Sequence, residues 1–362
     1  MTAAKRLDWV DAAKGISILM VVLMYSTYSV GEDTSAVGFM HYVIGFTTPF
    51  RMPEFFLISG LFLATVIVRP FARYADRRVV HYFYFYLLWA AIHIAVKAGL
   101  GQGDPLLAAS QLGLAIVEPY GVLWFIYMLG VFGLLARILW QIKAPHWLVL
   151  LVAAGLQMAP IVSQSYIVTQ FATYFVYFYL GYAVAPFVFR FVEEVQAFPQ
   201  LALVGLLAWA LLNGALVFTG GSETLPDHTV MGYGALPGVH LLLGIAGAFA
   251  VCTAAALLMR LPRMEWLVWL GEHSLIIYLA FALPMSAARI FALKTGLLTE
   301  PGMLSLVIFI AATIAPILLL FATRATGVGK FLFDRPTWAH LPGARQATRA
   351  ARVTRPAATP AE

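Results

Sequence analysis

A series of apolar stretches, most of them long enough to cross a bilayer, constrains the fold of this chain most strongly. A transmembrane helix needs roughly 20 predominantly apolar residues. Hydrophobic residues make up 62% of the 362 residues and charged residues 11%, whereas a soluble domain carries about 25% charged residues. We therefore predict an all-α, polytopic integral membrane protein with about ten transmembrane helices. The predicted spans are residues 14–31, 51–68, 79–99, 121–141, 146–163, 167–190, 201–219, 238–259, 268–292 and 302–323.

The distribution of lysine and arginine supports this number of spans. If the N-terminus is cytoplasmic, the cytoplasmic segments hold eighteen of these residues and the outer loops hold two, Lys97 and Lys294. This asymmetry is typical of membrane proteins, whose cytoplasmic loops carry the excess of positive charge. We predict a multi-pass topology with both termini in the cytoplasm. Residues 1–323 form the predicted membrane domain, and residues 324–362 form a basic, partly disordered cytoplasmic tail.

Several function classes are disfavoured by what the sequence contains. The net charge of +6 lies where the positive-inside pattern requires it, so we expect no nucleic-acid partner. Cys252 is the single cysteine, which excludes an internal disulfide and a cysteine metal cluster. The histidines lack metal-ligand spacing and no phosphate loop is present, so no metal and no resident cofactor are predicted. The first apolar run is too long for a signal peptide and is expected to remain as a helix.

The first span carries a polar stripe. Asp11 and Lys14 are three residues apart and lie on one helical face. Tyr25 follows Lys14 by eleven residues, so the two lie on the same stripe about 16 Å apart along the helix axis. A polar stripe on a membrane helix faces protein or water rather than lipid.

The second span begins with a charged motif, Phe50-Arg-Met-Pro-Glu-Phe-Phe-Leu-Ile-Ser-Gly60. Pro53 suits the first helical turn, and Glu54 is stabilised by the positive end of the helix dipole. Arg51 is a candidate fork for a carboxylate or phosphate. The alternative interpretation is a neutralising ion pair between Arg51 and Glu54 at a capped helix start. His41 precedes this motif in an apolar segment, residues 39–50, that is too short to span.

Two further stretches carry candidate residues, each with a plain structural alternative. Trp124 lies in an aromatic stretch, residues 120–127, that an interfacial aromatic belt also explains. Ser274 and Tyr278 follow a Glu-His pair that also suits a simple helix start. Arg289 lies at the outer end of the ninth span, where either a functional role or snorkelling to the headgroups accounts for it.

These motifs resemble those of the membrane acyltransferase-3 family, the integral-membrane O-acyltransferases that modify bacterial surface glycans, and most closely its fucose 4-O-acetylase-like branch. The matching anchors follow in order and cover residues 7 to 323: Asp11/Lys14, Phe50 to Gly60, Leu123-Trp-Phe125 and Ser274-x-x-x-Tyr278. The resemblance implies transfer of an acyl group from cytoplasmic acyl-CoA to a sugar hydroxyl at the outer face. It also implies a location in the bacterial cytoplasmic (inner) membrane.

The sequence departs from the family pattern at two histidine positions. The family signature in the first span is a basic residue, ten further residues and a histidine, and here these positions hold Lys14 and Tyr25. A second family histidine position holds Phe281. Attack of a hydroxyl on a thioester needs a base with a pKa near neutrality, as histidine has, whereas tyrosine titrates near 10. Tyr25 therefore either acts with a nearby cation such as Arg51, or donates a hydrogen bond while Glu54 or His41 acts as base.

We therefore predict an O-acyltransferase with acyl-CoA as co-substrate and a glycan or lipid-linked sugar as acceptor, surrounded by membrane lipid. The alternative is an inactive or altered relative that binds or transports an acyl donor or a lipid-linked sugar. The predicted catalytic residues are Tyr25, Arg51, Glu54 and His41, and the predicted donor-binding residues are Asp11, Lys14, Trp124, Ser274 and Tyr278.

Overall fold

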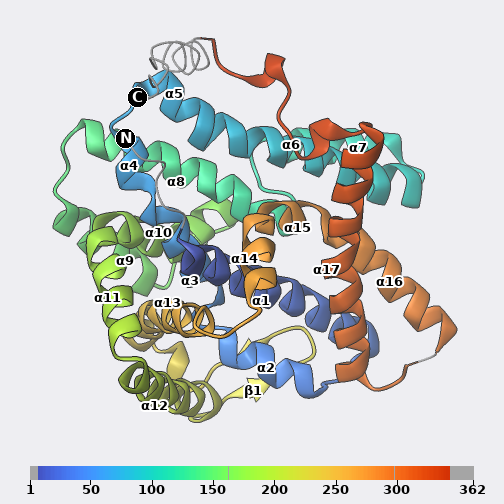
Figure 1. The fold of residues 1–362 in the computed structure, drawn as a ribbon. Helices are drawn as coiled ribbons and strands as arrows, with labels where there is room; N and C mark the ends of the chain where they lie inside the picture. Colours follow the sequence, from blue (N-terminus) through green and yellow to red (C-terminus); the bar gives the residue numbers. More distant parts are fainter. Residues whose placement is uncertain (1–6, 162, 297, 343–362) are drawn as a thin grey trace, which may run out of the picture. The chain divides into compact units, whose positions relative to one another are not determined.

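Residues 7–161, 163–296 and 298–342 are described by a computed structural model (Figure 1). They form α-helices, a few short 3-10 and π-helical turns, and one antiparallel ribbon of two short strands. The contacts divide the chain into two units. Unit 1 comprises Met1–Ala64 and Ala144–Gly327, and unit 2 comprises Thr65–Lys143 and Val328–Glu362.

Unit 1 contains most of the helices and the ribbon. Its elements are α1 (Asp8–Thr34), α2 (Phe39–Thr47), α3 (Arg51–Leu61), α9 (His146–Met158), α10 (Tyr166–Ala183), α11 (Ala185–Ala197), α12 (Pro199–Phe218), β1 (Glu223–Thr224), β2 (Thr229–Val230), η4 (Tyr233–Ala235), α13 (Pro237–Leu258), α14 (Glu265–Glu272), α15 (Ser274–Ala280), α16 (Ala282–Thr295) and α17 (Pro301–Thr326).

Unit 2 contains the shorter set of elements. After α4 (Leu63–Ile67), which crosses the sequence boundary, they are α5 (Phe71–Ala75), η1 (Asp76–Val80), α6 (His81–Ile94), η2 (Ala95–Gly101), α7 (Pro105–Leu114), η3 (Gly121–Leu123), α8 (Trp124–Gln141), η5 (Lys330–Leu332) and η6 (Thr337–Ala339).

The helices confirm the prediction of an all-α, polytopic membrane protein. Among the described residues, six helices are long and apolar enough to cross a membrane, and the number rises to eight if each of two bent pairs forms one span. The bent pairs are α10–α11, with an angle of 74°, and α15–α16, with an angle of 52°. The other two predicted spans contain shorter helices: 146–163 holds α9, and 51–68 is divided at Phe62 into α3 and α4.

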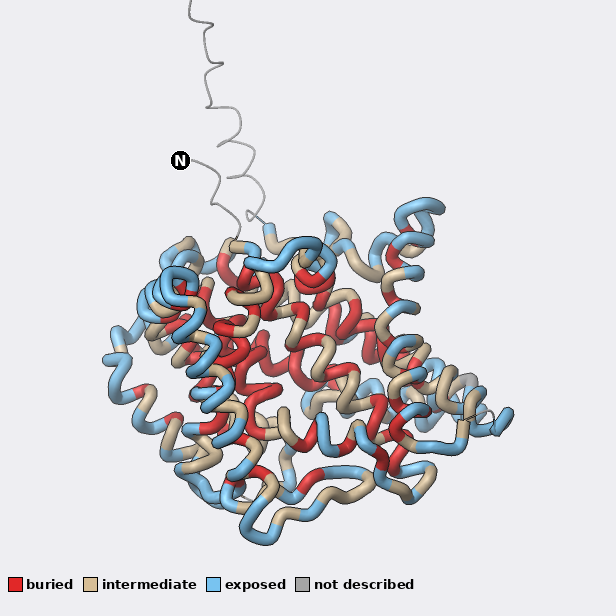
Figure 2. Tube along the Cα trace, turned by 60° about the horizontal axis from the view of Figure 1, so that its bottom comes forward, coloured by how far each residue is buried: buried red, intermediate tan, exposed pale blue. Residues whose placement is uncertain are grey.

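Helices α1 and α3 form the centre of unit 1. Helix α1 contacts α14, α17, α13 and α3, while α3 also contacts α10 and α13. Figure 1 shows α1 and α3 with α14 and α17 on one side and α10 to α13 on the other. Ten of the eleven residues of α3 are buried, including Arg51 and Glu54. In Figure 2 many helices alternate between buried and exposed residues, because one face packs inward while the other faces outward.

Glycines permit the closest helix contacts of unit 1. A Cβ atom at Gly271 would lie 1.6 Å from the carbonyl oxygen of Asp11, and one at Gly15 would lie 2.6 Å from that of Leu267. Gly60 and Gly181 serve the contact between α3 and α10 in the same way, each with a carbonyl oxygen 2.1 Å from the missing Cβ. Close approach through small residues is typical of membrane helix packing. It fixes α1 against α14 and α3 against α10.

Unit 2 is completed by residues 328–342, which we call the C-terminal strap. Arg335 donates to the Asp76 carboxylate at 2.6 Å and to its backbone carbonyl at 2.8 Å, and the backbone N–H of Leu341 donates to the same carboxylate at 2.8 Å. Tyr84 and Trp89 of α6 donate to backbone carbonyls of the strap. The first part of the predicted tail is therefore folded. Its remainder, with Arg345, Arg349, Arg352 and Arg355, lies outside the described residues, as do Lys5 and Arg6.

Candidate functional site

A line of polar side chains crosses the centre of unit 1 along α1 and α3. At the end nearest the N-terminus of α1, the ammonium of Lys14 pairs with the Asp11 carboxylate at 3.1 Å. The Lys14 side chain is 30% exposed and Asp11 only 9%, so the lysine is the accessible partner. Its Nζ also lies 5.8 Å from the centre of the Phe62 ring, a cation–π arrangement. Lys14 thus keeps an ammonium face available for an anion.

Glu54 forms the middle of this line. Ser17, one turn beyond Lys14 on α1, donates its hydroxyl to Glu54 Oε2 at 2.5 Å. Glu54 is fully buried, and its other oxygen, Oε1, has no hydrogen-bond partner. Isolated acids at membrane depth are expensive and are usually retained for function. The free Oε1 can accept a proton or a hydrogen bond.

Arg51 lies one turn before Glu54 on α3 and does not pair with it. Its Nη1 instead donates to the carbonyl of Ile44 at 3.3 Å and to the hydroxyl of Thr47 at 3.1 Å, both on α2. The predicted alternative of an Arg51–Glu54 ion pair is therefore wrong, since each group has a different partner. The buried Nε of Arg51 has no partner.

Tyrosines from two helices interact with the Arg51 guanidinium. Tyr25 and Tyr28 of α1 and Tyr174 of α10 lie close enough to interact with it electrostatically. Tyr174 in turn stacks on Phe56 of α3, with ring centres 5.3 Å apart. The structure therefore brings two predicted catalytic residues, Tyr25 and Arg51, into one aromatic, cationic environment.

Tyr25 and Phe281, at the two positions where the resemblance predicts histidines, touch each other. The rings of Tyr25 and Phe281 have centres 5.5 Å apart. Tyr278, on α15, is buried, and the centre of its ring lies 6.2 Å from that of Phe281. Ser274 is buried at the first turn of α15. The motif stretches of α1 and α15 are far apart in the sequence, and the structure brings them together at these rings.

His41 is fixed between α2 and the loop that follows β1. Its Nδ1 accepts from the backbone N–H of Gly38 at 3.1 Å, so Nε2 carries the proton and donates to the carbonyl of Pro226 at 3.1 Å. The ring is fully buried. Burial lowers the pKa of His41 below its ordinary value. With both nitrogens occupied, His41 orients α2, and acting as a base requires one of these bonds to break.

The remaining candidates lie elsewhere. Trp124 opens α8 in unit 2, is buried, and meets Phe125 edge-on with ring centres 6.4 Å apart. Arg289 forms an ion pair with Asp33 at 3.2 Å and donates to the carbonyl of Ser29 at 3.3 Å. It therefore ties α16 to the end of α1, which neither predicted role for Arg289 included.

Sequence reasoning missed Ser17, Thr47 and Tyr174. Ser17 is the informative omission, because its hydroxyl also lies 2.7 Å from the carbonyl of Ala13. A serine in a helix usually satisfies itself in this way, so its contact with Glu54, 37 residues later, carries no local signal. Within the described residues, no group of three or more His, Cys, Asp or Glu side chains could hold a metal ion.

Comparison with known proteins gives one positive result. A family model described as an acyltransferase domain matches residues 7–322. That range includes every residue of the polar line as well as Tyr25 and Phe281. Neither the curated proteins nor the solved structures gave a match.

Proposed function

This chain belongs to the acyltransferase-3 family, and on that premise we propose that it transfers an acyl group from acyl-CoA to a hydroxyl of a cell-envelope glycan, with Glu54 as the proton acceptor. The family match and the spanning helices make it a multi-pass membrane acyltransferase. We further propose that the acyl group is acetyl or a similar group and that the acceptor is a glycan. The membrane is proposed to be the bacterial inner membrane, with both termini in the cytoplasm.

The observation that carries the proposal is the free oxygen of Glu54. Acyl transfer requires the acceptor hydroxyl to attack the thioester carbonyl while a base removes its proton, and the departing thiolate then takes up a proton. Glu54 Oε1 has no partner, whereas Oε2 is held by Ser17. Both nitrogens of His41 are engaged. Of the three predicted bases, Glu54 is the one whose acceptor oxygen is held in place and free. Unlike Tyr25, it needs no neighbouring cation in order to act as a base.

The other groups of the line have roles that suit their places. Lys14, partly exposed and already oriented by Asp11, is proposed to bind a phosphate of CoA as a point charge. Arg51, with an unused Nε, is proposed to stabilise the negative charge that develops on the carbonyl oxygen. The roles of Trp124, Ser274 and Tyr278 in donor binding stay predictions.

Replacing Glu54 by glutamine tests the proposal. Glutamine can still bond to Ser17 but cannot take a proton, so transfer from radiolabelled acetyl-CoA to envelope glycans should fall by about 10²- to 10⁴-fold. Glu265→Gln makes the same change at an exposed residue of α14 and should leave the rate unchanged. Full activity in Glu54→Gln membranes would exclude this carboxylate as the base.

A second candidate function has its own observation. The contact of Tyr25 with Phe281 places aromatic carbon where the family pattern has histidines, which favours a relative that binds or transports an acyl donor or lipid-linked sugar without turnover. Wild-type protein that binds several acyl-CoAs but transfers none of their acyl groups to glycan would support this candidate and exclude acyl transfer.

A further inference from the structure

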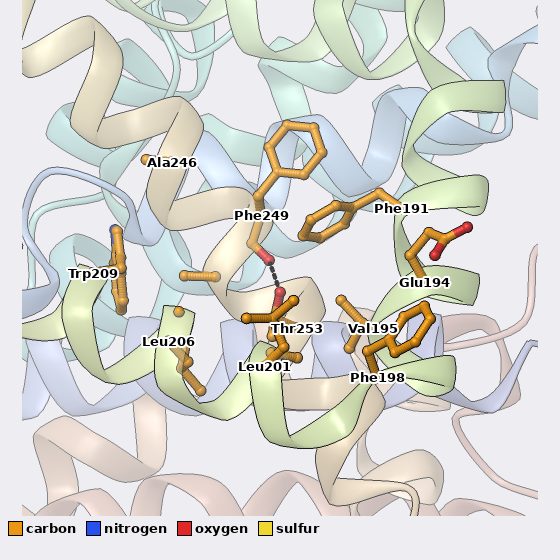
Figure 3. A pocket seen from close by; sticks show the side chains of 13 residues that line it. Phe191, Glu194, Val195, Phe198, Leu201, Leu206, Trp209, Ala246, Phe249 and Thr253 are labelled. Carbon is orange, nitrogen blue, oxygen red and sulfur yellow. Dashed lines mark hydrogen bonds between the residues drawn. The ribbon is translucent and has the colours of Figure 1, made fainter.

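A long apolar groove lies between α11, α12 and α13 of unit 1 (Figure 3). Its volume is about 700 Å³, and its large side chains are Phe191, Phe198, Leu206, Trp209 and Phe249. Figure 3 shows Trp209 at one end and Phe198 with Glu194 at the other. Over the eleven residues from Phe198 to Trp209 a helix advances about 16 Å. This matches the depth of one leaflet of the hydrocarbon core, about 15 Å.

The groove opens on a surface that faces lipid. Helix α12 is a candidate span without a charged residue, and its outer leucines, such as Leu207 and Leu211, are exposed. Leu201 is 70% exposed and also lines the groove, so groove and outer surface are continuous. The hydroxyl of Thr253 donates within α13 to the carbonyl of Phe249, so it needs no hydrogen bond from a ligand. The lining therefore suits a hydrocarbon chain.

Two residues of opposite charge, one helical turn apart on α11, lie at or next to one end of the groove. Glu194 lines the groove, and Arg190 precedes it by one helical turn on α11. Both are exposed, and neither forms an ion pair with another residue that the structure describes. Helix α11 is amphipathic and turns by 74° away from α10, which is typical of a helix at the headgroup level. A carboxylate and a guanidinium side by side complement a headgroup that carries an ammonium and a phosphate.

We propose that this groove binds one acyl chain of a phospholipid with an amine headgroup, phosphatidylethanolamine in chemical class. Its ammonium contacts Glu194, its phosphate contacts Arg190, and its chain extends along α12 to Trp209. An anionic lipid without the amine meets the carboxylate of Glu194 with like charge. The site does not depend on the proposed acyl transfer.

Photolabelling in nanodiscs tests the lipid and the site together. The full chain is reconstituted with phosphatidylethanolamine or phosphatidylglycerol carrying a photoreactive acyl chain, and labelled peptides are mapped by mass spectrometry. The exposed outer face of α17, including Ile310 and Leu318, reports general lipid contact. We expect groove peptides to be labelled about fivefold more by the ethanolamine lipid, the equivalent of roughly one charge pair near the surface. On α17 the two lipids should label equally.

Two pairs of variants separate this site from general lipid contact. Gly205→Phe fills the groove, since nothing lies within 4 Å of a Cβ there, and should reduce groove labelling to the α17 level. Leu211→Phe, on the same helix outside the lining, should not. Glu194→Lys should remove or invert the headgroup preference, whereas Glu193→Lys should retain it. Monodisperse elution and an unchanged melting temperature verify the fold.

Two results would overturn the proposal. Equal labelling of the groove by both lipids in the wild type would show ordinary annular lipid. Undiminished groove labelling in Gly205→Phe protein would show that no chain occupies the groove.

Discussion

At the scale of single residues, Tyr25 and Phe281 stand where the resemblance predicts two histidines. They are 256 positions apart in the sequence, yet their rings have centres 5.5 Å apart. Two rings in contact share the space that two imidazoles would otherwise fill, and neither offers a base that titrates near neutrality. In the proposed mechanism the proton acceptor therefore comes from another element, α3, as Glu54.

A histidine at position 25 should rescue a chain that has lost this carboxylate. In the Glu54→Gln background, Tyr25→His should raise transfer by about 10²- to 10⁴-fold, because an imidazole is smaller than a phenol and restores a base. The regained rate should rise with pH through a midpoint near 6.5, measured as initial rates of glycan acylation.

The matched control is Tyr25→Phe in the same background, which removes the hydroxyl without adding a base and should rescue nothing. In otherwise wild-type protein, Tyr25→His should change the rate little. If the double variant stays as inactive as Glu54→Gln, position 25 does not face the reacting hydroxyl.

Reversing the charge of Lys14 should weaken donor binding. Lys14→Arg preserves the cation and should retain affinity for CoA. Lys14→Glu both removes an attraction and adds a repulsion, and should weaken binding roughly thirtyfold at low salt. Equilibrium binding of CoA to purified protein measures this, with Lys294→Glu as a control at an exposed lysine of α16. Equal affinity in the Lys14 and Lys294 variants would exclude the phosphate role.

Some of these residues could be predicted and others could not, for a physical reason. Arg51 and Glu54 stand out because charge within an apolar run is costly, and their helix start was predicted from Pro53. Their partners could not be predicted. Glu54 bonds to Ser17 of α1 and Arg51 to Thr47 of α2, and neither pairing leaves a periodic signal in the sequence.

At the scale of elements, the contact of α1 with α14 depends on the absence of a side chain at Gly271. Alanine in place of a helical glycine usually stabilises by about 0.5–1 kcal/mol. At Gly271 the added Cβ would lie 1.6 Å from the Asp11 carbonyl, so the helices must separate. Gly271→Ala should destabilise the protein by about 1–3 kcal/mol, seen as a lower melting temperature in detergent.

Gly155→Ala on α9 is the matched control, since nothing lies within 4 Å of its Cβ position. It should leave the melting temperature unchanged or raise it. If Gly271→Ala melts no lower than Gly155→Ala, the close approach of α1 and α14 does not stabilise the fold.

The positions of the elements follow from hydrophobicity, but their bends do not. Every predicted span contains helix, because the length of an apolar run sets where helices form. The break at Phe62 and the bends after Ala183 and Ala280 fall within continuous apolar runs. Two of these breaks are followed at once by a proline, Pro186 in the first turn of α11 and Pro284 near the start of α16. Proline interrupts helical hydrogen bonding, and a hydropathy pattern does not register it.

At the scale of the whole molecule, the predicted orientation can be tested by labelling single cysteines in intact cells. Glu223→Cys, in the exposed β1 strand, should react with an impermeant maleimide from outside. Arg77→Cys should not react, because it lies between the predicted spans 51–68 and 79–99, on the predicted cytoplasmic side, although its side chain is exposed. Reaction of Arg77→Cys from outside would contradict the positive-inside assignment.

The division into two units was not predicted, since hydropathy gives the order of spans along the chain but not which of them belong together. The predicted boundary at residue 323 lies near the end of α17 at Thr326. The sequence beyond this boundary predicts a basic tail, yet residues 328–342 form the strap. A strap bound by one buried carboxylate, Asp76, has no compositional signature.

The strap has a consequence for how this protein is made. Helices α5 to α8 emerge from the ribosome early, but the residues that satisfy Asp76, Tyr84 and Trp89 are translated only after all the helices of unit 1. During synthesis the carboxylate of Asp76 therefore stays without its partner Arg335 while about 250 further residues are translated. At 5–20 residues per second this takes roughly 12–50 seconds. A chain that stops early carries this unpaired acid permanently. The strap can therefore complete unit 2 only after the last helix of unit 1 has been made.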